Sequence, residues 1–257
     1  MIDKVIEQYK SHGNLDIRVE LHKRYSKNKL GFNNWIFSNY QITGELKVLE
    51  LGCGTGELWK SNLDSIDKME QLIITDFSND MVETTKLVIG NRDNVNYERM
   101  DIQNISFENE TFDIVIANML LHHVNDIDKA ISEVNRVLKK GGVFYCATFG
   151  ENGVVDYLAS LFKDVVNQNL ENKTFTLQNG KTFLNRYFDT VEKIIYDDEL
   201  QVTSIDDLVQ YIQSLNGISE IGSLEEEIIR NRLESEFNNG MLIIPKEYGM
   251  FIARKES

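Results

Sequence analysis

Proline, cysteine and histidine are scarce in this sequence, with one, two and four copies among 257 residues. Cys53 and Cys146 lie in apolar contexts, which predicts buried reduced thiols and offers too few ligands for a metal site. No run approaches the roughly 18 apolar residues of a membrane-spanning helix. The first residues carry acid and no apolar stretch, so no secretory signal is expected. These absences predict a cytoplasmic protein without a metal.

Positive charge is also in deficit. The chain has 27 Lys and Arg against 41 Asp and Glu, a formal net charge of −14 with histidine neutral. Such a surface repels nucleic-acid phosphates and anionic membrane surfaces. We therefore expect neither nucleic acid nor membrane as a partner. The sequence leaves the oligomeric state open.

What is present in the first part of the chain is an alternation of short apolar runs with helical patterns. The apolar runs read as strands covered on both faces, as in a parallel sheet: 47–51, 71–75, 95–99, 113–117 and 143–148. Between the last two, an apolar stripe at helical spacing predicts a helix over 127–138, closed by Lys139–Gly142. Strand–helix alternation with short loops predicts βαβ units, and hence a doubly wound α/β sheet.

After Phe149 the pattern changes. An amphipathic helix is expected over 154–165, and further strands over 191–196 and 248–253. Ser204 and Ser223 each begin a capping-box pattern that predicts a helix start. We expect one domain over 1–257, in four parts: a helical N-terminal cover (1–40), a core (45–150), a helical insertion (151–190), and C-terminal strands and helices that complete the sheet (191–257).

The most informative stretch is the end of the first predicted strand, where Gly52, Gly54 and Gly56 alternate before a helix. Glycine permits a tight turn with positive φ, and its missing Cβ lets a ligand lie on the backbone. The following helix N-terminus offers free N–H groups to an anion. The nicotinamide fingerprint requires glycine at its sixth position, where this chain has Glu57. A nicotinamide oxidoreductase is therefore a disfavoured alternative.

Acidic residues end the next two predicted strands. Asp76 follows Gly54 by 22 residues, the position from which an acid can accept ribose hydroxyls. Phe77 can pack on an adenine, and Asp101 suits its amino group. Ligands of open α/β sheets bind along the carboxyl ends of the strands, so these positions together favour an adenosyl ligand.

Six stretches in this order resemble the motifs of class I S-adenosylmethionine-dependent methyltransferases: Glu50–Gly56, Thr75–Ser78, Asp101–Ile102, Phe112–Asn118, His122–Val124 and Leu138–Gly142. The resemblance covers about residues 45–150 and is closest to the small-molecule branch that includes the ubiquinone/menaquinone-type enzymes ("type 11"). It implies a Rossmann-like, mostly parallel seven-stranded sheet with helices on both faces.

The resemblance also implies roles for individual residues, with S-adenosyl-L-methionine as co-substrate. Gly52, Gly54 and Gly56 would line the methionyl arm, and Cys53 would add packing and backbone contacts. Glu50 would face the ammonium group. The other cofactor-binding candidates are Asp76 for the ribose, Phe77 and Met81 beside the adenine, Asp101 and Ile102 at its edge, Asn118 beside the transferable methyl, and Tyr25 from the N-terminal flank.

The acceptor is less defined. His122 and His123 are candidate bases, because imidazole titrates near neutrality, although adjacent histidines at such a junction are more often packing or capping groups. The chain reads Asn118-Met119-Leu120-Leu121 where amino methyltransferases of nucleic acids and proteins usually show Pro-Pro-Tyr, which favours a small-molecule acceptor. Aromatic residues under the covers are candidates for its pocket or for the core: Tyr25, Trp35, Tyr157 and Phe162. A non-catalytic S-adenosylmethionine-binding or partner-binding protein of this fold is the main alternative.

Overall fold

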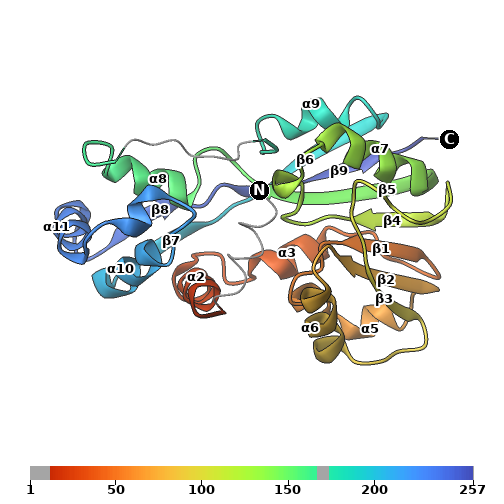
Figure 1. The fold of residues 1–257 in the computed structure, drawn as a ribbon, viewed down its shortest axis with the longest axis horizontal. Coiled ribbons are helices and arrows are strands. Elements are labelled where there is room, and N and C mark those ends of the chain that lie inside the picture. The colour runs from red at the N-terminus through yellow and green to blue at the C-terminus, as the bar shows by residue number, and fades with distance from the viewer. Residues whose placement is uncertain (1–11, 167–173, 257) are drawn as a thin grey trace. The chain divides into compact units, whose positions relative to one another are not determined.

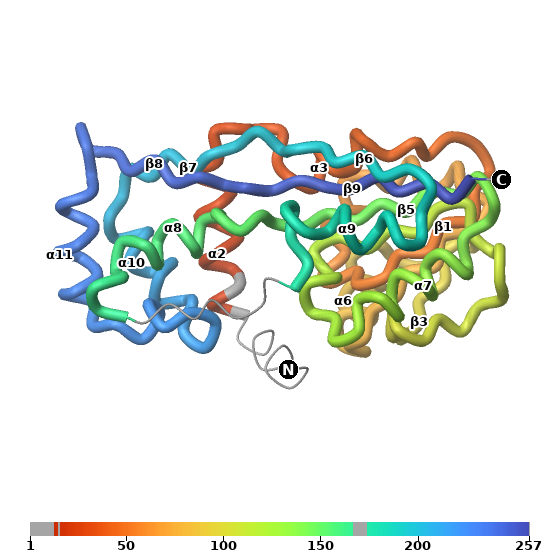
Figure 2. Tube along the Cα trace, turned by 90° about the horizontal axis from the view of Figure 1, so that it is seen from above, coloured from red at the N-terminus to blue at the C-terminus, as the bar shows by residue number. Residues whose placement is uncertain are grey.

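The computed structural model describes residues 12–166 and 174–256 (Figures 1 and 2). By its internal contacts the chain divides into two compact units. Among the described residues, unit 1 comprises 12–31, 150–166 and 197–248; unit 2 comprises 32–149, 174–196 and 249–256. The N-terminal cover expected over 1–40 is thus divided between the units. The division into two compact units does not test the expectation of a single domain over 1–257, which stays a prediction.

Unit 2 contains a seven-stranded sheet in the order β3-β2-β1-β4-β5-β9-β6. Its strands are β1 (Lys47–Leu51), β2 (Gln71–Asp76), β3 (Val95–Arg99), β4 (Phe112–Ile116), β5 (Leu138–Phe149), β6 (Thr190–Tyr196) and β9 (Tyr248–Arg254), of which β9 begins at the last residue of unit 1. The pairs β1–β2, β2–β3, β1–β4 and β4–β5 are parallel. The predicted strands and the doubly wound, mostly parallel sheet are confirmed.

Helices of unit 2 cover both faces of this sheet. They are α3 (Phe32–Ser38), α4 (Glu57–Lys60), α5 (Leu63–Ile66), α6 (Asn79–Ile89), the 3-10 turn η1 (Leu121–His123), α7 (Ile127–Val137) and α9 (Gly180–Leu184). Successive β1 residues enter different cores: Leu49 joins the cluster containing α7 and α9, and Val48 joins the cluster containing α3 to α6. This alternation follows from the period of two in a strand, and it directs Glu50 toward the α3–α6 side.

Unit 1 is built around its own apolar core. Its elements are α2 (His12–Tyr25), α8 (Val154–Leu161), β7 (Glu199–Val202), α10 (Ile205–Gln213), the 3-10 turn η2 (Glu220–Ser223), α11 (Glu226–Glu236) and β8 (Leu242–Pro245). The strands β7 and β8 form a separate antiparallel pair, drawn side by side in Figure 2. Of the segment 191–257, only β6 and β9 therefore complete the large sheet.

Two local expectations were wrong. Lys139–Gly142 belongs to β5 and does not close α7. In the pairing of β4 with β5, Phe112 lies opposite Leu138 and Ile114 lies opposite Val143. The residues between these two pairs form an irregular start to β5. Ser223 does not begin α11, whose N-cap is Glu225. The Ser223 hydroxyl instead donates to Asn216 Oδ1, which holds it in the preceding 3-10 turn.

Among residues 12–166 and 174–256, every helix is too short or too polar to cross a membrane.

The turn after β1 generates a stability prediction. Gly56 has φ of +77°, and a Cβ built there would lie 2.9 Å from Thr85 Cγ2. Gly56→Ala combines left-handed strain with overpacking, so we expect it to lower the free energy of unfolding by about 2–4 kcal/mol. Gly44→Ala is the matched control, because Gly44 has φ of +86° and no described atom within 4 Å of its Cβ position. Urea unfolding compares the two, and equal losses would contradict the packing argument.

Candidate functional site

The glycine-rich turn joins β1 to α4 at the carboxyl edge of the sheet. Gly52, Gly54 and Gly56 have φ of +78°, +56° and +77°, so the positive φ expected at this turn is confirmed. The N–H groups of Gly52 and Cys53 both donate to the carbonyl oxygen of Thr75 at 2.9 Å, which ties the turn to β2. No described atom lies within 4 Å of a Cβ built at Gly54. The turn is therefore fixed by β2 and open at its middle glycine.

Glu50 lies just before this turn and is only 4% exposed. Trp59 Nε1, from α4, donates to Glu50 Oε2 at 2.8 Å. Burial raises the pKa of this carboxyl from 4.5 to about 7; the Trp59 hydrogen bond opposes the rise and the neighbouring Asp76 charge adds to it. No Lys, Arg or His in the described residues forms an ion pair with Glu50. A cationic ligand group beside it would compensate the buried charge.

Asp76 ends β2 and closes the turn from the other side. Gly54 N donates to its Oδ2 at 3.1 Å, and Ser78 N donates to its Oδ1 at 2.8 Å. Burial raises the pKa of Asp76, and the backbone hydrogen bonds from Ser78, Gly54 and Phe77 oppose that rise. A carboxylate oxygen can accept more than one hydrogen bond, so Asp76 can hold the loop and still accept hydroxyl groups of a ligand.

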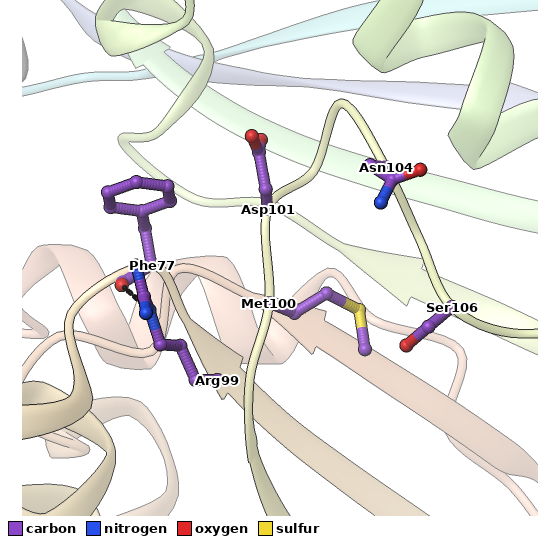
Figure 3. A pocket seen from close by; sticks show the side chains of 6 residues that line it. All are labelled: Phe77, Arg99, Met100, Asp101, Asn104 and Ser106. Carbon is purple, nitrogen blue, oxygen red and sulfur yellow. Dashed lines mark hydrogen bonds between the residues drawn. The ribbon is translucent and has the colours of Figure 1, made fainter.

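A cavity of about 280 Å³ adjoins the ends of β2 and β3 (Figure 3). It is lined by Phe77, Arg99, Met100, Asp101, Asn104 and Ser106. In Figure 3 the Phe77 ring and the Asp101 carboxylate project in the same direction from neighbouring segments. Arg99 fixes Phe77: its Nε donates to the Phe77 carbonyl at 2.9 Å, and its guanidinium carbon lies 5.1 Å from the ring centroid. An aromatic face and a carboxylate at one cavity suit a flat heteroaromatic ring with an amino group.

Three other candidates differ in how they can contribute. Met81 lies in the first turn of α6 and is partly exposed. Ile102 is only 5% exposed and belongs to the apolar core, so only its backbone can face a ligand at that edge. Cys53 is buried, and its Sγ accepts a hydrogen bond from Thr85 Oγ1 at 3.3 Å. Burial raises the pKa of the Cys53 thiol, so this side chain packs as an uncharged group.

Asn118 follows β4 and is held from two sides. Its Nδ2 donates to the Tyr40 hydroxyl at 2.6 Å, and Ala147 N donates to its Oδ1 at 3.3 Å. The next residue, Met119, has φ of +50°, and its N–H donates to the Ala147 carbonyl. Tyr40 and Trp59 were not identified from the sequence. An aromatic residue three positions after Gly56 was the available signal for Trp59.

The adjacent histidines form part of η1. The side chain of His122 is buried, its ring centroid lies 4.0 Å from that of His123, and the Phe149 ring is 4.5 Å away. Within the described structure, Nδ1 of each histidine is buried without a hydrogen-bond partner. Burial lowers the pKa of both imidazoles below the usual 6.5. Both are therefore uncharged at neutral pH, and their low basicity weakens a role as general base.

The cover residues are less concentrated than the sequence suggested. Tyr25 belongs to unit 1, where its hydroxyl donates to Asp207 Oδ2 at 2.6 Å; its contact with a cofactor stays a prediction. Phe162 is fully buried in the core of unit 1, which favours the core alternative for this residue. Tyr157 packs against that same core, whereas Trp35 belongs to unit 2 and stacks on Phe32.

Candidate metal ligands do not cluster within residues 12–166 and 174–256. No group of three or more His, Cys, Asp or Glu side chains in this part of the chain could hold a metal ion.

Comparison with known sequences assigns the region around the turn. Residues 49–146 match the family described as "Methyltransferase domain". These residues are therefore similar to a methyltransferase domain. The matched region contains the glycine turn, both acidic strand ends and the Asn118 loop, but it leaves the rest of the chain unassigned.

Curated relatives resemble about half of the chain. A demethylmenaquinone methyltransferase of Leptospira interrogans is 31% identical over 140 residues, which are 48% of this chain and 54% of the relative. A malonyl-[acyl-carrier protein] O-methyltransferase of Bacillus anthracis is 27% identical over 135 residues, 52% of this chain and 49% of the relative. The chain thus spans about half the length of these relatives.

Solved structures share the fold at low sequence identity. A protein from Bacillus halodurans C-125 superposes with a TM-score of 0.60 at 16% identity, covering 88% of this chain and 99% of that one. The YcgJ protein of Bacillus subtilis gives 0.56 at 19% identity, covering 88% and 98%. The [4+2]-cyclase SpnF gives 0.54 at 16% identity, covering 87% and 80%. These likenesses show the fold alone.

The buried carboxylate predicts a pH-dependent stability difference. Because the pKa of Glu50 is raised in the folded state, the fold binds its proton more tightly than the unfolded chain does, and stability falls as pH rises from about 4.5 to about 7. Glu50→Gln removes this loss. Between about pH 5.5 and pH 8, we expect the stability of Glu50→Gln relative to the parent to increase by about 2 kcal/mol. Denaturant unfolding at both pH values measures it, and an unchanged difference would contradict the burial of a titrating Glu50.

Proposed function

We propose that this chain is an S-adenosylmethionine-dependent methyltransferase that transfers a methyl group to a small-molecule acceptor. The observation that carries the proposal is the arrangement around Gly54: an open backbone position with the Glu50 carboxylate on β1 and the Asp76 carboxylate on β2. This arrangement offers an acid to a ligand's ammonium group and a second acid to its hydroxyls. A cytoplasmic location stays a prediction from the sequence.

The proposed binding mode follows the carboxyl edge of the sheet. The methionyl arm lies along Gly52, Gly54 and Gly56, with its ammonium group facing Glu50. The ribose hydroxyls donate to Asp76. The adenine occupies the cavity beside Phe77 and Asp101, with Met81 and the Ile102 backbone at its edges. Burial of Glu50 without a cation, and the aromatic–acid pair at the cavity, support this orientation.

The reaction places modest demands on the protein. The sulfonium of the bound cofactor supplies an activated methyl group. The acceptor would take this methyl group by in-line displacement, with the electron pair of the broken carbon–sulfur bond left on sulfur. Asn118, fixed by Tyr40 and Ala147, borders the methyl in this proposal. His122 and His123 remain base candidates, although their lowered pKa values favour an acceptor that is already deprotonated or that loses its proton after transfer.

The relatives do not agree on one acceptor. One is named for demethylmenaquinone and the other for a malonyl group on an acyl-carrier protein. The shared feature is the methyltransferase domain, so our proposal for this chain extends to a small-molecule acceptor and leaves its identity and the methylated atom unassigned.

Calorimetric titration tests the cofactor assignment. We expect S-adenosylmethionine and S-adenosylhomocysteine to bind with micromolar affinity and NAD⁺ to show no binding, because Glu57 follows the glycine turn. Binding of NAD⁺ without either adenosyl compound would reject the proposal. Incubation of metabolite pools with isotope-labelled S-adenosylmethionine then tests turnover and identifies the acceptor. Cofactor binding without transfer to any pool would favour the non-catalytic alternative.

Asp76 provides a residue-level prediction. Asp76→Ala removes the proposed ribose acceptor and the bond from Gly54 N, so S-adenosylhomocysteine should bind at least tenfold more weakly. Asp80→Ala is the matched control, because Asp80 is an exposed acid in the first turn of α6 and changes the net charge equally. Calorimetry measures both, with circular dichroism to verify folding. Parent-like affinity of Asp76→Ala would refute the ribose assignment.

A further inference from the structure

Trp59 occupies an unusual position for a polar donor. It lies in α4, directly after the glycine turn, and its side chain has no exposed surface. The Phe37 ring packs against it edge-on, with centroids 5.8 Å apart. Its one polar atom, Nε1, donates to Glu50 Oε2 at 2.8 Å. The indole is thus fixed by apolar packing, and its N–H points at the carboxylate that the proposed function assigns to the cofactor.

The two oxygens of Glu50 consequently have different environments. Oε2 accepts the indole N–H, whereas no described side chain or backbone group donates to Oε1. The titratable groups that interact with Glu50 are Asp76 from β2, Cys53 from the turn and Tyr40 from the segment before β1. None of them is a cation. A buried carboxylate in this setting depends on hydrogen bonding to stay ionised.

We propose that Trp59 is a positioning residue that orients the Glu50 carboxylate and keeps it ionised, so that Oε1 can receive the ammonium group of the cofactor. The inference rests on the proposed function and adds to it a proton-coupled binding step. When the ligand is absent, the Glu50 carboxyl group is partly protonated. The arriving ammonium group displaces that proton to solvent. Trp59 favours the displacement, because its N–H stabilises only the ionised form fully.

The hydrogen bond has a measurable consequence. The indole N–H is the interaction that lowers the pKa of Glu50 against the effect of burial. Trp59→Phe keeps an aromatic ring and removes the donor, so the pKa of Glu50 should rise above about 7. Binding of a ligand with an ammonium group then requires a higher pH. A ligand without that group should be indifferent to the change.

The experiment compares two ligands in two variants. S-adenosylhomocysteine carries the ammonium group, and 5′-methylthioadenosine carries the adenosyl group without it. Trp35→Phe is the matched control, because Trp35 is the other tryptophan of the sequence and packs on Phe32 and Tyr196 without contacting Glu50 through a hydrogen bond. Calorimetric affinities are measured from pH 6 to pH 8.5, with circular dichroism as the folding check.

We expect Trp59→Phe to bind S-adenosylhomocysteine at least tenfold more weakly than the parent at pH 7, with the deficit shrinking toward pH 8.5. Its affinity for 5′-methylthioadenosine should equal that of the parent, and Trp35→Phe should follow the parent with both ligands. An equal loss for both ligands at every pH would overturn the inference, since it would show a purely structural role. Parent-like binding of S-adenosylhomocysteine at all pH values would overturn it as well.

A second variant covers the case in which Trp59→Phe does not fold. In the Trp35→Phe background Trp59 is the only tryptophan, so growth with 3-benzothienylalanine replaces its N–H by sulfur at nearly constant shape. The same pH-dependent, ammonium-specific loss is expected, and its absence would overturn the inference. Failure of the proposed function looks different: the unmodified protein would bind neither adenosyl compound, whereas failure of the inference alone leaves parent binding intact.

Discussion

A single buried carboxylate constrains the structure around the glycine turn. Glu50 lies in β1, an interior strand, where the period of the strand turns it toward the α3–α6 side of the sheet. An ionised acid in that position is costly unless donors or cations compensate it. The described residues provide one donor, the Trp59 indole, and no ion pair. The short helix α4 begins immediately after the turn, and its third residue, Trp59, reaches Glu50 from there.

The glycine turn places α4 where Trp59 can donate to Glu50, and it also leaves backbone open to a ligand. Gly56 is required by packing against Thr85, whereas a Cβ at Gly54 would meet open space. Asp76 connects the turn to the cavity. It accepts a hydrogen bond from Gly54 N, and it lies at the end of β2 beside the cavity lined by Phe77. The turn, the β2 end and the cavity thus form one continuous edge, held by backbone hydrogen bonds that do not depend on a ligand.

Sequence reasoning succeeded where local patterns determine the outcome. The apolar runs located the seven strands, and Gly52, Gly54 and Gly56 indicated a turn with positive φ. It failed where distant packing decides. Burial could not be read from the sequence: the Ile102 side chain lies in the core, which leaves only its backbone for a ligand, and Phe162 fills the core of unit 1. The Trp59–Glu50 and Tyr40–Asn118 hydrogen bonds join separate elements, and although the position of Trp59 after the glycine turn was a signal, the sequence indicated neither pairing. The segment 197–248 was predicted to help complete the large sheet. It belongs to unit 1 instead, because its apolar residues pack with α2 and α8.

The central claim is that an adenosyl cofactor lies along the carboxyl edge of β1, β2 and β3. A crystal structure of the protein with S-adenosylhomocysteine tests it most directly. The account predicts the ligand's ammonium nitrogen within hydrogen-bond distance of Glu50 Oε1, its ribose hydroxyls on Asp76, and its adenine beside Phe77 and Asp101. A ligand bound elsewhere on the chain, or one bound at this edge in the reversed direction with its adenine at Glu50, would contradict it.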